Sequence, residues 1–280
     1  MTAAADALHY AQPSVSHHLA RLEAEVGVPL VQRAGRGVRL TDAGRLLVER
    51  AEEILGRLDA AHAELDAYAG LRAGVVRVAA FPSALATLIP ETLARFGAGY
   101  PDIGVELIEA EPPASLQGLR SGDVDVALVF EYDDAASEHR GMTATRLLDE
   151  PMYVVTASDD DRPGDRAELT SYADERWIAG CERCRRHLLE RSGHAGFAPT
   201  IAFETDDYVA VQSLVAAGVG VSTLPGLALL AHRDPGVRIE RLRDDRRSVH
   251  AVTFGAPPPP VAVRRFLDVL CDVVAPHAWP

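Results

Sequence analysis

A heptad repeat between residues 41 and 68 constrains the fold of this chain more than any other feature. Thr41 is a plausible N-cap and the residues after it are mostly polar, so one long helix is expected from there to Tyr68. Apolar side chains recur along this helix at spacings of four and three residues: Leu47, Ala51, Ile54, Leu58, Ala61, Leu65 and Tyr68. So narrow a stripe is typical of a helix that pairs with another helix, and we expect the same helix of a second subunit. The alternative is that the stripe packs on the C-terminal part of its own chain.

Charge is unevenly divided between the head of the chain, residues 1–47, and the body that follows. With 280 residues, two folding units are expected. The head carries five arginines and four acidic residues, so the acidic excess behind the net charge of −13 lies in the body. An acidic body with an arginine-bearing head is typical of a protein that contacts nucleic acid through one small module.

The head has the pattern of two short helices followed by a hairpin. Residues 2–8 are rich in alanine, and a second helix over residues 12–26 has Pro13 in its first turn, where proline is tolerated. An apolar stripe, which we expect to be buried, runs along this second helix: Val15, Leu19, Leu22 and Val26. Gly27 ends the helix, and residues 30–40 then predict a hairpin with glycines at its tip. A hairpin beside a helix-turn-helix is a wing.

The body alternates strand-like and helix-like segments, which predicts an α/β domain with a mainly parallel sheet. Residues 75–80 form the first expected strand, and two similar α/β halves follow. Two further strands are expected at residues 152–157 and 248–254. The latter, with a final helix over residues 261–274, is expected to return to the first half.

Composition and motifs exclude several classes of protein. Hydrophobic residues make up 48% and charged residues 25% of the chain, which is typical of a globular protein and not of a disordered one. The chain contains no apolar run of membrane-spanning length and no signal peptide, so we expect a cytoplasmic protein without membrane contact. It also lacks GxSxG, HExxH, a Walker loop and a GxGxxG after a strand, so we expect neither an enzyme nor a bound cofactor.

Several longer sequence segments in the head and in the body of the chain are distinctive. In the head they are AAADAL, AQPSVSHHLARLEAEVGVPL and RLTDAG; in the body they are GVVRVAAFPSALATLIPETLARFGAGYPDIGVEL, LRSGDVDVALV and FETDDYVAVQSLVAAGVGVSTLP. Together they resemble the LysR-type transcriptional regulators over essentially the whole chain. The resemblance implies a mixed architecture: an N-terminal all-α winged helix-turn-helix plus linker helix, then an α/β effector domain of two subdomains, similar to periplasmic binding proteins.

The resemblance also implies domain boundaries and partners. The DNA-binding domain is expected over residues 1–41, the dimerising linker helix over 42–70 and the effector-binding domain over 74–280. Within the last, subdomain I is expected over 74–148 and 251–280, and subdomain II over 149–250. The implied function is sequence-specific operator binding modulated by a small-molecule effector. The implied partners are double-stranded DNA with a pseudo-palindromic operator, the effector, a second copy of the chain in a dimer or tetramer, and RNA polymerase.

One part of the family pattern is absent at the beginning of the chain. Family members carry a first helix ahead of the segment that matches AAADAL, and that helix is missing here. Either the start codon lies upstream, or the head is truncated. In the second case the chain would be an effector-binding protein without DNA binding.

The resemblance places DNA contacts on the second helix and on the wing. Glutamine can pair with an adenine edge, and serine and arginine can bind phosphates. His17 would give a weaker and pH-sensitive phosphate contact, unless it is only a solvated surface residue. The candidate residues are Gln12, Pro13, Ser16, His17 and Arg21 in the helix and Arg33, Arg36 and Arg39 in the wing, where some arginines can instead be structural.

The resemblance places effector contacts at the turn after the first strand. There Ser83 and the helix N–H groups can bind an anionic group, although Ser83 can also be a simple N-cap. Glu204, Asp206 and Asp207 make the facing wall acidic, which favours an effector with an amine, a hydroxyl or an aromatic ring over a plain dicarboxylate; Asp207 can instead cap its helix. The candidate residues are Phe81, Pro82, Ser83, Ala84, Phe130, Glu131, Phe203, Glu204 and Thr205.

Cys181 and Cys184 form a single CxxC, followed by His187 and His194. This pattern occurs in zinc sites and in redox pairs. A structural zinc site seldom has one CxxC alone, so we expect no bound metal. We favour the alternative of ordinary free thiols in a reducing cytoplasm.

Overall fold

The computed structural model describes residues 5, 10–35, 37–68, 74–132, 139, 141–159, 168–255, 257–274 and 279. By its internal contacts the chain divides into two compact units. The smaller unit comprises residues 1–65 and 120–122, and the larger unit comprises residues 66–119 and 123–280.

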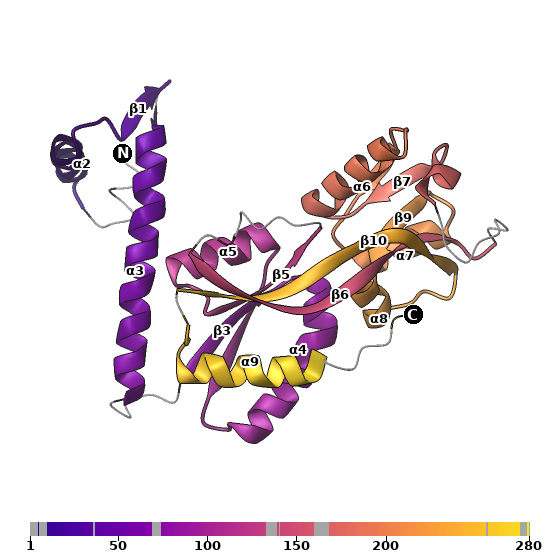
Figure 1. Ribbon diagram of the computed structural model, residues 1–280. Coiled ribbons are helices and arrows are strands. Elements are labelled where there is room, and N and C mark those ends of the chain that lie inside the picture. The colour runs from indigo at the N-terminus through magenta and orange to yellow at the C-terminus, as the bar shows by residue number, and fades with distance from the viewer. Residues whose placement is uncertain are drawn as a thin grey trace. The chain divides into compact units, whose positions relative to one another are not determined.

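The smaller unit contains the expected helix and hairpin (Figure 1). Helix α2 (Gln12–Val26) has a proline in its first turn and ends at Gly27, whose φ of 80° is left-handed. Strands β1 (Val31–Ala34) and β2 (Gly37–Leu40) pair antiparallel, as predicted for the wing. Of the predicted first helix, only Ala5 is among the described residues.

The apolar stripe of α2 is more exposed than the sequence predicts. Leu22 and Val26 are exposed, and none of the residues of α2, all of which the structure describes, is buried. Val15 and Leu19 of the same stripe are half-buried, so the stripe is only partly covered. The helix is also held by Glu23, whose carboxylate accepts the backbone N–H groups of Leu30 and Val31 at 2.7 and 3.1 Å.

The predicted long helix is present as α3 (Asp42–Tyr68). The hydroxyl of Thr41 accepts the N–H of Gly44 at 3.0 Å, which is the expected N-cap interaction. The backbone N–H and C=O groups inside this helix bond to one another, so a partner can contact the helix only through its side chains.

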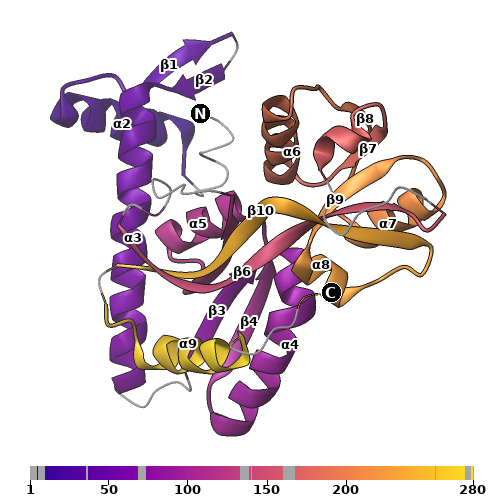
Figure 2. The same ribbon diagram turned by 45° about the vertical axis from the view of Figure 1, so that its right-hand side comes forward.

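The larger unit contains an eight-stranded sheet with the order β4-β3-β5-β10-β6-β9-β7-β8. Three parallel strands form one half: β3 (Val75–Ala80), β4 (Gly104–Glu109) and β5 (Val126–Glu131). Three more parallel strands form the other half: β7 (Arg176–Ala179), β8 (Thr200–Glu204) and β9 (Val221–Pro225). Two long antiparallel strands run through both halves and join them, as Figure 2 shows: β6 (Met142–Ala157) and β10 (Val237–Phe254).

The two joining strands begin much earlier than the sequence predicts. The expected strands at residues 152–157 and 248–254 are only the C-terminal parts of β6 and β10. Their N-terminal parts are charged and often exposed, so they lack the apolar run that marks a buried strand. Each N-terminal part pairs with the C-terminal part of the other strand: Ala144 of β6 with Val252 of β10, and Glu240 of β10 with Val154 of β6.

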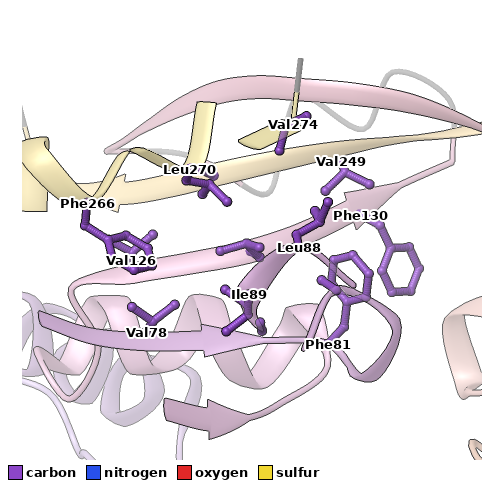
Figure 3. Packing of buried hydrophobic residues seen from close by; sticks show 14 of the residues in the cluster. Val78, Phe81, Leu88, Ile89, Val126, Phe130, Val249, Phe266, Leu270 and Val274 are labelled. Atoms are coloured by element: carbon purple, nitrogen blue, oxygen red, sulfur yellow. The ribbon is translucent and has the colours of Figure 1, made fainter. Parts of the chain in front are cut away.

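Helices cover both faces of the first half. Helices α4 (Pro82–Gly99) and α9 (Val261–Val274) pack on one face, where alternate strand residues such as Val78 and Val126 meet Phe266 (Figure 3). On the opposite face, the cluster that α5 (Pro112–Ser121) joins is built from the intervening strand residues: Ala79, Ala127 and Val129. As predicted, the C-terminal helix returns to the first half.

The second half has the same layered construction. Helix α6 (Glu182–His194) and the short 3-10 helix η1 (Leu169–Tyr172) cluster with Trp177, whereas α7 (Tyr208–Ala216) and α8 (Gly226–Ala231) cluster with Ile178. Successive strand residues point to opposite faces, so two adjacent residues serve two cores. The predicted α/β body with two halves is confirmed. Among the described helices, none combines the length and the apolar character needed to cross a membrane.

Candidate functional site

The predicted DNA-contact residues of α2 lie on the surface of the smaller unit. Gln12, Pro13, His17 and Arg21 are exposed, and Ser16 is half-buried. Gln12 Nε2 donates to Ser16 Oγ at 2.9 Å, so these two polar side chains lie one turn apart on the same face. In the first turn Pro13 has no N–H group, and the N–H groups of Ser14 and Val15 donate to the carbonyl of Ala11 at 2.9 and 3.3 Å. This turn therefore offers DNA mainly its side chains.

The wing adds cationic groups to this surface. Arg33 on β1 and Arg39 on β2 are both exposed. Arg36 lies outside the described residues. Arg21 on α2 forms an exposed ion pair with Glu25, with 3.0 Å between Nε and Oε1. Whether these arginines contact DNA stays a prediction.

Most of the predicted dimerisation stripe is exposed on α3. Leu47 is half-buried. Exposed members of the stripe follow it along the helix: Ala51, Ile54, Leu58, Ala61 and Leu65. The side chain of Tyr68 lies outside the described part of the chain. A row of exposed leucine and isoleucine side chains on one helix is costly in water unless a partner covers it.

The larger unit contains a cavity of about 60 Å³ at the carboxyl ends of its parallel strands. In open α/β sheets this edge is where ligands bind. All six parallel strands contribute, at or just beyond their ends: Phe81, Pro82 and Ser83 after β3, Glu111 after β4, Phe130 and Tyr132 at β5, Gly180 and Cys181 after β7, Thr205 and Asp206 after β8, and Pro225 in β9.

Five of the nine predicted effector residues line this cavity: Phe81, Pro82, Ser83, Phe130 and Thr205. The other four are not among its lining residues: Ala84, Glu131, Phe203 and Glu204. Glu131 Oε1 lies 3.0 Å from His139 Nε2, Glu204 is paired with Arg185 at 2.7 Å, and Phe203 is exposed. Asp207 caps α7, since its carboxylate accepts two backbone N–H groups at 2.9 and 3.1 Å.

A buried arginine that the sequence analysis does not identify lies at the floor of this cavity. Arg247 on β10 is 3% exposed, and its Nε donates to Glu150 Oε1 at 2.6 Å. Its Nη2 donates to the hydroxyl of Ser83 at 3.1 Å, so Ser83 is not the N-cap of α4 but a hydrogen-bond acceptor for Arg247. The guanidinium also lies 4.1 Å from the ring centroid of Phe130 and 5.1 Å from that of Phe81.

A sequence signal for Arg247 exists in the alternation of β10. Residues 245, 247, 249 and 251 are all buried, whereas their neighbours 246, 248 and 250 are exposed or half-buried. Extending the period of two back from Val249 and Ala251 therefore places Arg247 on the buried face. The run Asp-Asp-Arg-Arg around it instead suggests a solvated segment.

Burial and charge oppose each other at two ionisable groups of the cavity. Burial lowers the pKa of Arg247, but the charge and hydrogen bond of Glu150, together with the charges of Tyr132 and Cys184, outweigh this effect and raise the pKa, so the guanidinium stays charged. Burial raises the pKa of Glu111 above its usual value, opposed by a hydrogen bond with Cys181 and the charge of Arg247. Glu111 Oε2 is buried and has no hydrogen-bond partner. Glu111 is therefore a lining residue of the cavity that carries an unsatisfied acceptor.

The cavity walls combine aromatic rings with hydrogen-bonding groups. Phe81 and Phe130 meet edge to face with 5.0 Å between ring centroids (Figure 3), and Tyr132 extends this aromatic wall. Glu111 and Asp206 supply carboxylates. Nowhere in the described part of the chain are three or more His, Cys, Asp or Glu side chains grouped so that they could hold a metal ion. The arrangement can bind a small organic molecule with a donor group.

Comparisons with known proteins agree for both units. Residues 69–275 match the family model of the LysR substrate binding domain, and residues 1–45 match that of the bacterial regulatory helix-turn-helix protein, lysR family. The HTH-type transcriptional regulator YcgK of Bacillus subtilis (strain 168) is 30% identical over 263 residues, which cover 84% of this chain and 78% of YcgK. The match over residues 1–45 favours a regulator over an effector-binding protein without DNA binding.

Solved structures show the same fold. A cysteine mutant of OxyR from Corynebacterium glutamicum is 28% identical, with a TM-score of 0.63, and the match covers 97% of this chain and 86% of OxyR. Full-length CbnR in complex with its target DNA is 24% identical, with a TM-score of 0.60, and the match covers 97% of this chain and 93% of CbnR. The chain therefore belongs to the LysR family and is a DNA-binding transcriptional regulator with an effector-binding domain.

Proposed function

We propose that the chain binds a pseudo-palindromic operator as a dimer and that a small molecule in the cavity modulates this binding. The observation that carries the proposal is the exposed heptad stripe of α3, which follows the arginine-bearing helix and wing directly in the chain. A two-fold symmetric dimer presents two such surfaces to two half-sites. The proposed boundaries are those expected above, with the linker helix over residues 42–70 between the DNA-binding and effector-binding domains.

In the proposed DNA complex, the first turn of α2 enters the major groove. Gln12 can read an adenine edge, and Ser16 can bind a phosphate. Arg33 and Arg39 of the wing contact the DNA backbone beside the groove, where charge is the main contribution to affinity. Gln12, Arg33 and Arg39 are exposed and Ser16 is half-buried, which supports this arrangement.

The proposed dimer interface can be tested on α3 alone. Leu58 belongs to the stripe and is 51% exposed, whereas Val48 is off the stripe and is 41% exposed. A charge introduced at position 58 has to be desolvated when two helices pair, so Leu58→Glu is expected to weaken the dimer by at least tenfold. Val48→Glu is the matched control. Sedimentation over a concentration series measures both, and equal dimerisation of the two variants would contradict the proposed interface.

The proposed effector site is small in this conformation. Its volume of about 60 Å³ is well below the roughly 300 Å³ at which ligand pockets usually begin. Binding of a larger effector therefore requires the two walls of the cavity to separate, and this displacement is the proposed link to the linker helices. Glu111 and Asp206 favour an effector that carries an amine or another hydrogen-bond donor, and the aromatic wall favours a ring.

The function is tested by measuring binding of the protein to the intergenic DNA next to its own gene, across a series of salt concentrations. A scrambled duplex of equal length and composition is the control. Selective binding, with affinity that falls steeply as salt rises, is the expected result. Equal affinity for the two duplexes would overturn operator binding at this locus.

A further inference from the structure

The two cysteines of the CxxC lie together in the wall of the cavity. Cys181 is the N-cap of α6, and Cys184 follows one turn later. Both are free thiols, and both line the cavity. Their sulfur atoms are 2.8 Å apart, already within hydrogen-bonding contact. A disulfide has a sulfur–sulfur distance of about 2.0 Å, so only a small shift of the side chains separates the pair from a covalent bond.

The surroundings of Cys184 favour its thiolate. A hydrogen bond from Cys181 lowers the pKa of Cys184 against the opposite effect of burial, and the charge of Arg247 and a hydrogen bond from the hydroxyl of Tyr132 also lower it. The Tyr132 oxygen lies 3.6 Å from the Cys184 sulfur. The thiolate is the nucleophilic form of cysteine. Cys184 is therefore suited to react first.

Cys181 is suited to react second, with the oxidised sulfur of Cys184. Its hydrogen bond to Cys184 and its burial raise the pKa of Cys181, so it stays a thiol beside the Cys184 sulfur. Once Cys184 is oxidised, its negative charge and its hydrogen bond no longer hold the proton on Cys181. Cys181 can then attack the oxidised sulfur as a thiolate and give its proton to the leaving hydroxide. The two cysteines thus differ in reactivity although they are only three residues apart.

The cavity limits the size of the oxidant. Its volume of about 60 Å³ has room for a molecule of a few heavy atoms and not for a tripeptide disulfide. A metal ion is a poor alternative occupant, because His187, the nearest histidine in the motif, is bonded through Nε2 to Asp245 at 2.8 Å and stacked on Tyr132 with 3.8 Å between ring centroids. The geometry points to a small hydroperoxide as the reactant.

We propose that Cys181 and Cys184 form a reversible redox pair, which a small hydroperoxide oxidises to an intramolecular disulfide inside the effector cavity. The Cys184 thiolate attacks the terminal peroxide oxygen, so that a sulfur–oxygen bond forms and the oxygen–oxygen bond breaks. The alkoxide takes up the proton lost by the Cys184 thiol and leaves as an alcohol. When the reactant is hydrogen peroxide, the leaving product is water. Cys181 then attacks the sulfur of this sulfenic acid, and the hydroxide leaves as water with the Cys181 proton. Two electrons pass from the two sulfurs to the peroxide.

Oxidation changes what the cavity offers to a ligand. The disulfide removes the thiolate that accepts the Tyr132 hydroxyl and faces Arg247. It also removes the thiol that hydrogen-bonds with Glu111, leaving that carboxylate less satisfied. The redox state of the pair therefore sets the hydrogen-bonding groups of the proposed effector site. The oxidation itself does not depend on which effector or operator the protein binds.

The test uses the full chain with Cys271→Ser as the background, because Cys271 is exposed and could form disulfides between molecules. The reduced protein is treated with equimolar hydrogen peroxide, and its thiols and intact mass are measured. We expect both remaining thiols to disappear, the mass to fall by two hydrogens, and dithiothreitol to restore both. Survival of two titratable thiols, or a gain in mass without a disulfide, would overturn the proposal.

Single variants in the same background assign the two roles. We expect Cys181→Ser to stop at a sulfenic acid that dimedone traps, and Cys184→Ser to react at least tenfold more slowly than Cys181→Ser. Equal rates for the two variants would overturn the assignment. Tyr132→Phe keeps the ring and removes the donor, so the pH midpoint of the reaction should rise and the rate at pH 7 should fall several-fold. Circular dichroism checks that each variant is folded, and an unchanged pH profile in Tyr132→Phe would contradict the role of Tyr132.

Discussion

The wing and the effector cavity use arginine in opposite ways. Arg39 is exposed on β2 of the wing. Arg247 is almost fully buried on β10, where it is paired with a carboxylate that is itself 0% exposed, Glu150. Water solvates the first charge, which is therefore available to a polyanion at little cost. The second charge has been removed from water, and only its ion pair, its hydrogen bond to Ser83 and the ring of Phe130 compensate for that loss.

The largest effect is expected from removing the buried charge. Arg247→Met leaves Glu150 buried without its partner, and breaking such a pair costs about 3 to 5 kcal/mol in the free energy of unfolding. Urea denaturation of the full chain, followed by circular dichroism, measures this free energy. Arg95→Met is the matched control, because Arg95 pairs with Glu91 on the exposed surface of α4 and should lose less than 1 kcal/mol.

The double variant separates lost charge pairing from lost packing. Adding Glu150→Gln to Arg247→Met removes the stranded carboxylate, so the double variant should be more stable than Arg247→Met alone. The amide can still accept the N–H of Leu227, which Glu150 Oε2 accepts at 2.7 Å. If the double variant is no more stable than the single one, the stability comes from the stacking of Arg247 on the aromatic rings and not from the ion pair.

The second effect concerns the exposed arginines and should appear in binding instead of stability. Arg33→Ala and Arg39→Ala are each expected to weaken operator binding about fivefold and to reduce the slope of log affinity against log salt by about 1. Their free energies of unfolding should change by less than about 0.5 kcal/mol. Fluorescence anisotropy with the intergenic duplex measures the affinity, and Arg95→Ala is the control. A wing variant that keeps its salt slope does not contact a phosphate.

The comparison also explains which parts of the molecule are predictable from the sequence. Residues 75–80 form a strand at the predicted bounds because all six residues lack the Gly, Pro and polar breakers that end a strand. The wing follows from the glycines at its tip, since Gly35 has a φ of 58° that favours glycine. In both cases a local pattern contains the whole signal.

The parts that the sequence does not predict depend on contacts between distant residues. The charged beginning of each joining strand, β6 and β10, is held by pairing with the C-terminal part of the other strand. Arg247 and Ser83 are 164 residues apart, and nothing local to either indicates their hydrogen bond. The proximity of Cys184 to Arg247 and Tyr132 likewise follows from the folding of three separate segments into one cavity. Apolar periodicity predicts elements but not the polar groups that meet between them.

The third prediction concerns Glu111, whose buried charge is less well compensated than that of Arg247. Burial raises the pKa of Glu111, so the folded chain holds this proton more tightly than the unfolded chain does. The stability contribution of Glu111 therefore falls as pH rises from below its ordinary pKa of 4.5 through the folded value. Glu111→Gln removes the ionisation and should raise Tm by about 2 °C at pH 7, with a smaller gain near pH 4. Scanning calorimetry at both pH values measures this, and a lower Tm at pH 7 would mean that the carboxylate has a partner in solution.

The smallest effect returns to the exposed surface, where Glu25 competes with DNA for Arg21. The ion pair on α2 is exposed on both sides and is worth about 0.3 to 0.5 kcal/mol. Glu25→Gln frees Arg21 for a phosphate and removes a negative charge from the DNA-facing unit, so operator affinity should rise about twofold at low salt while stability falls slightly. Glu91→Gln on α4 breaks an exposed pair of the same spacing in the larger unit and is the control. If both variants leave DNA binding unchanged, Arg21 does not face the DNA, and the DNA-contacting surface is limited to the wing and the first turn of α2.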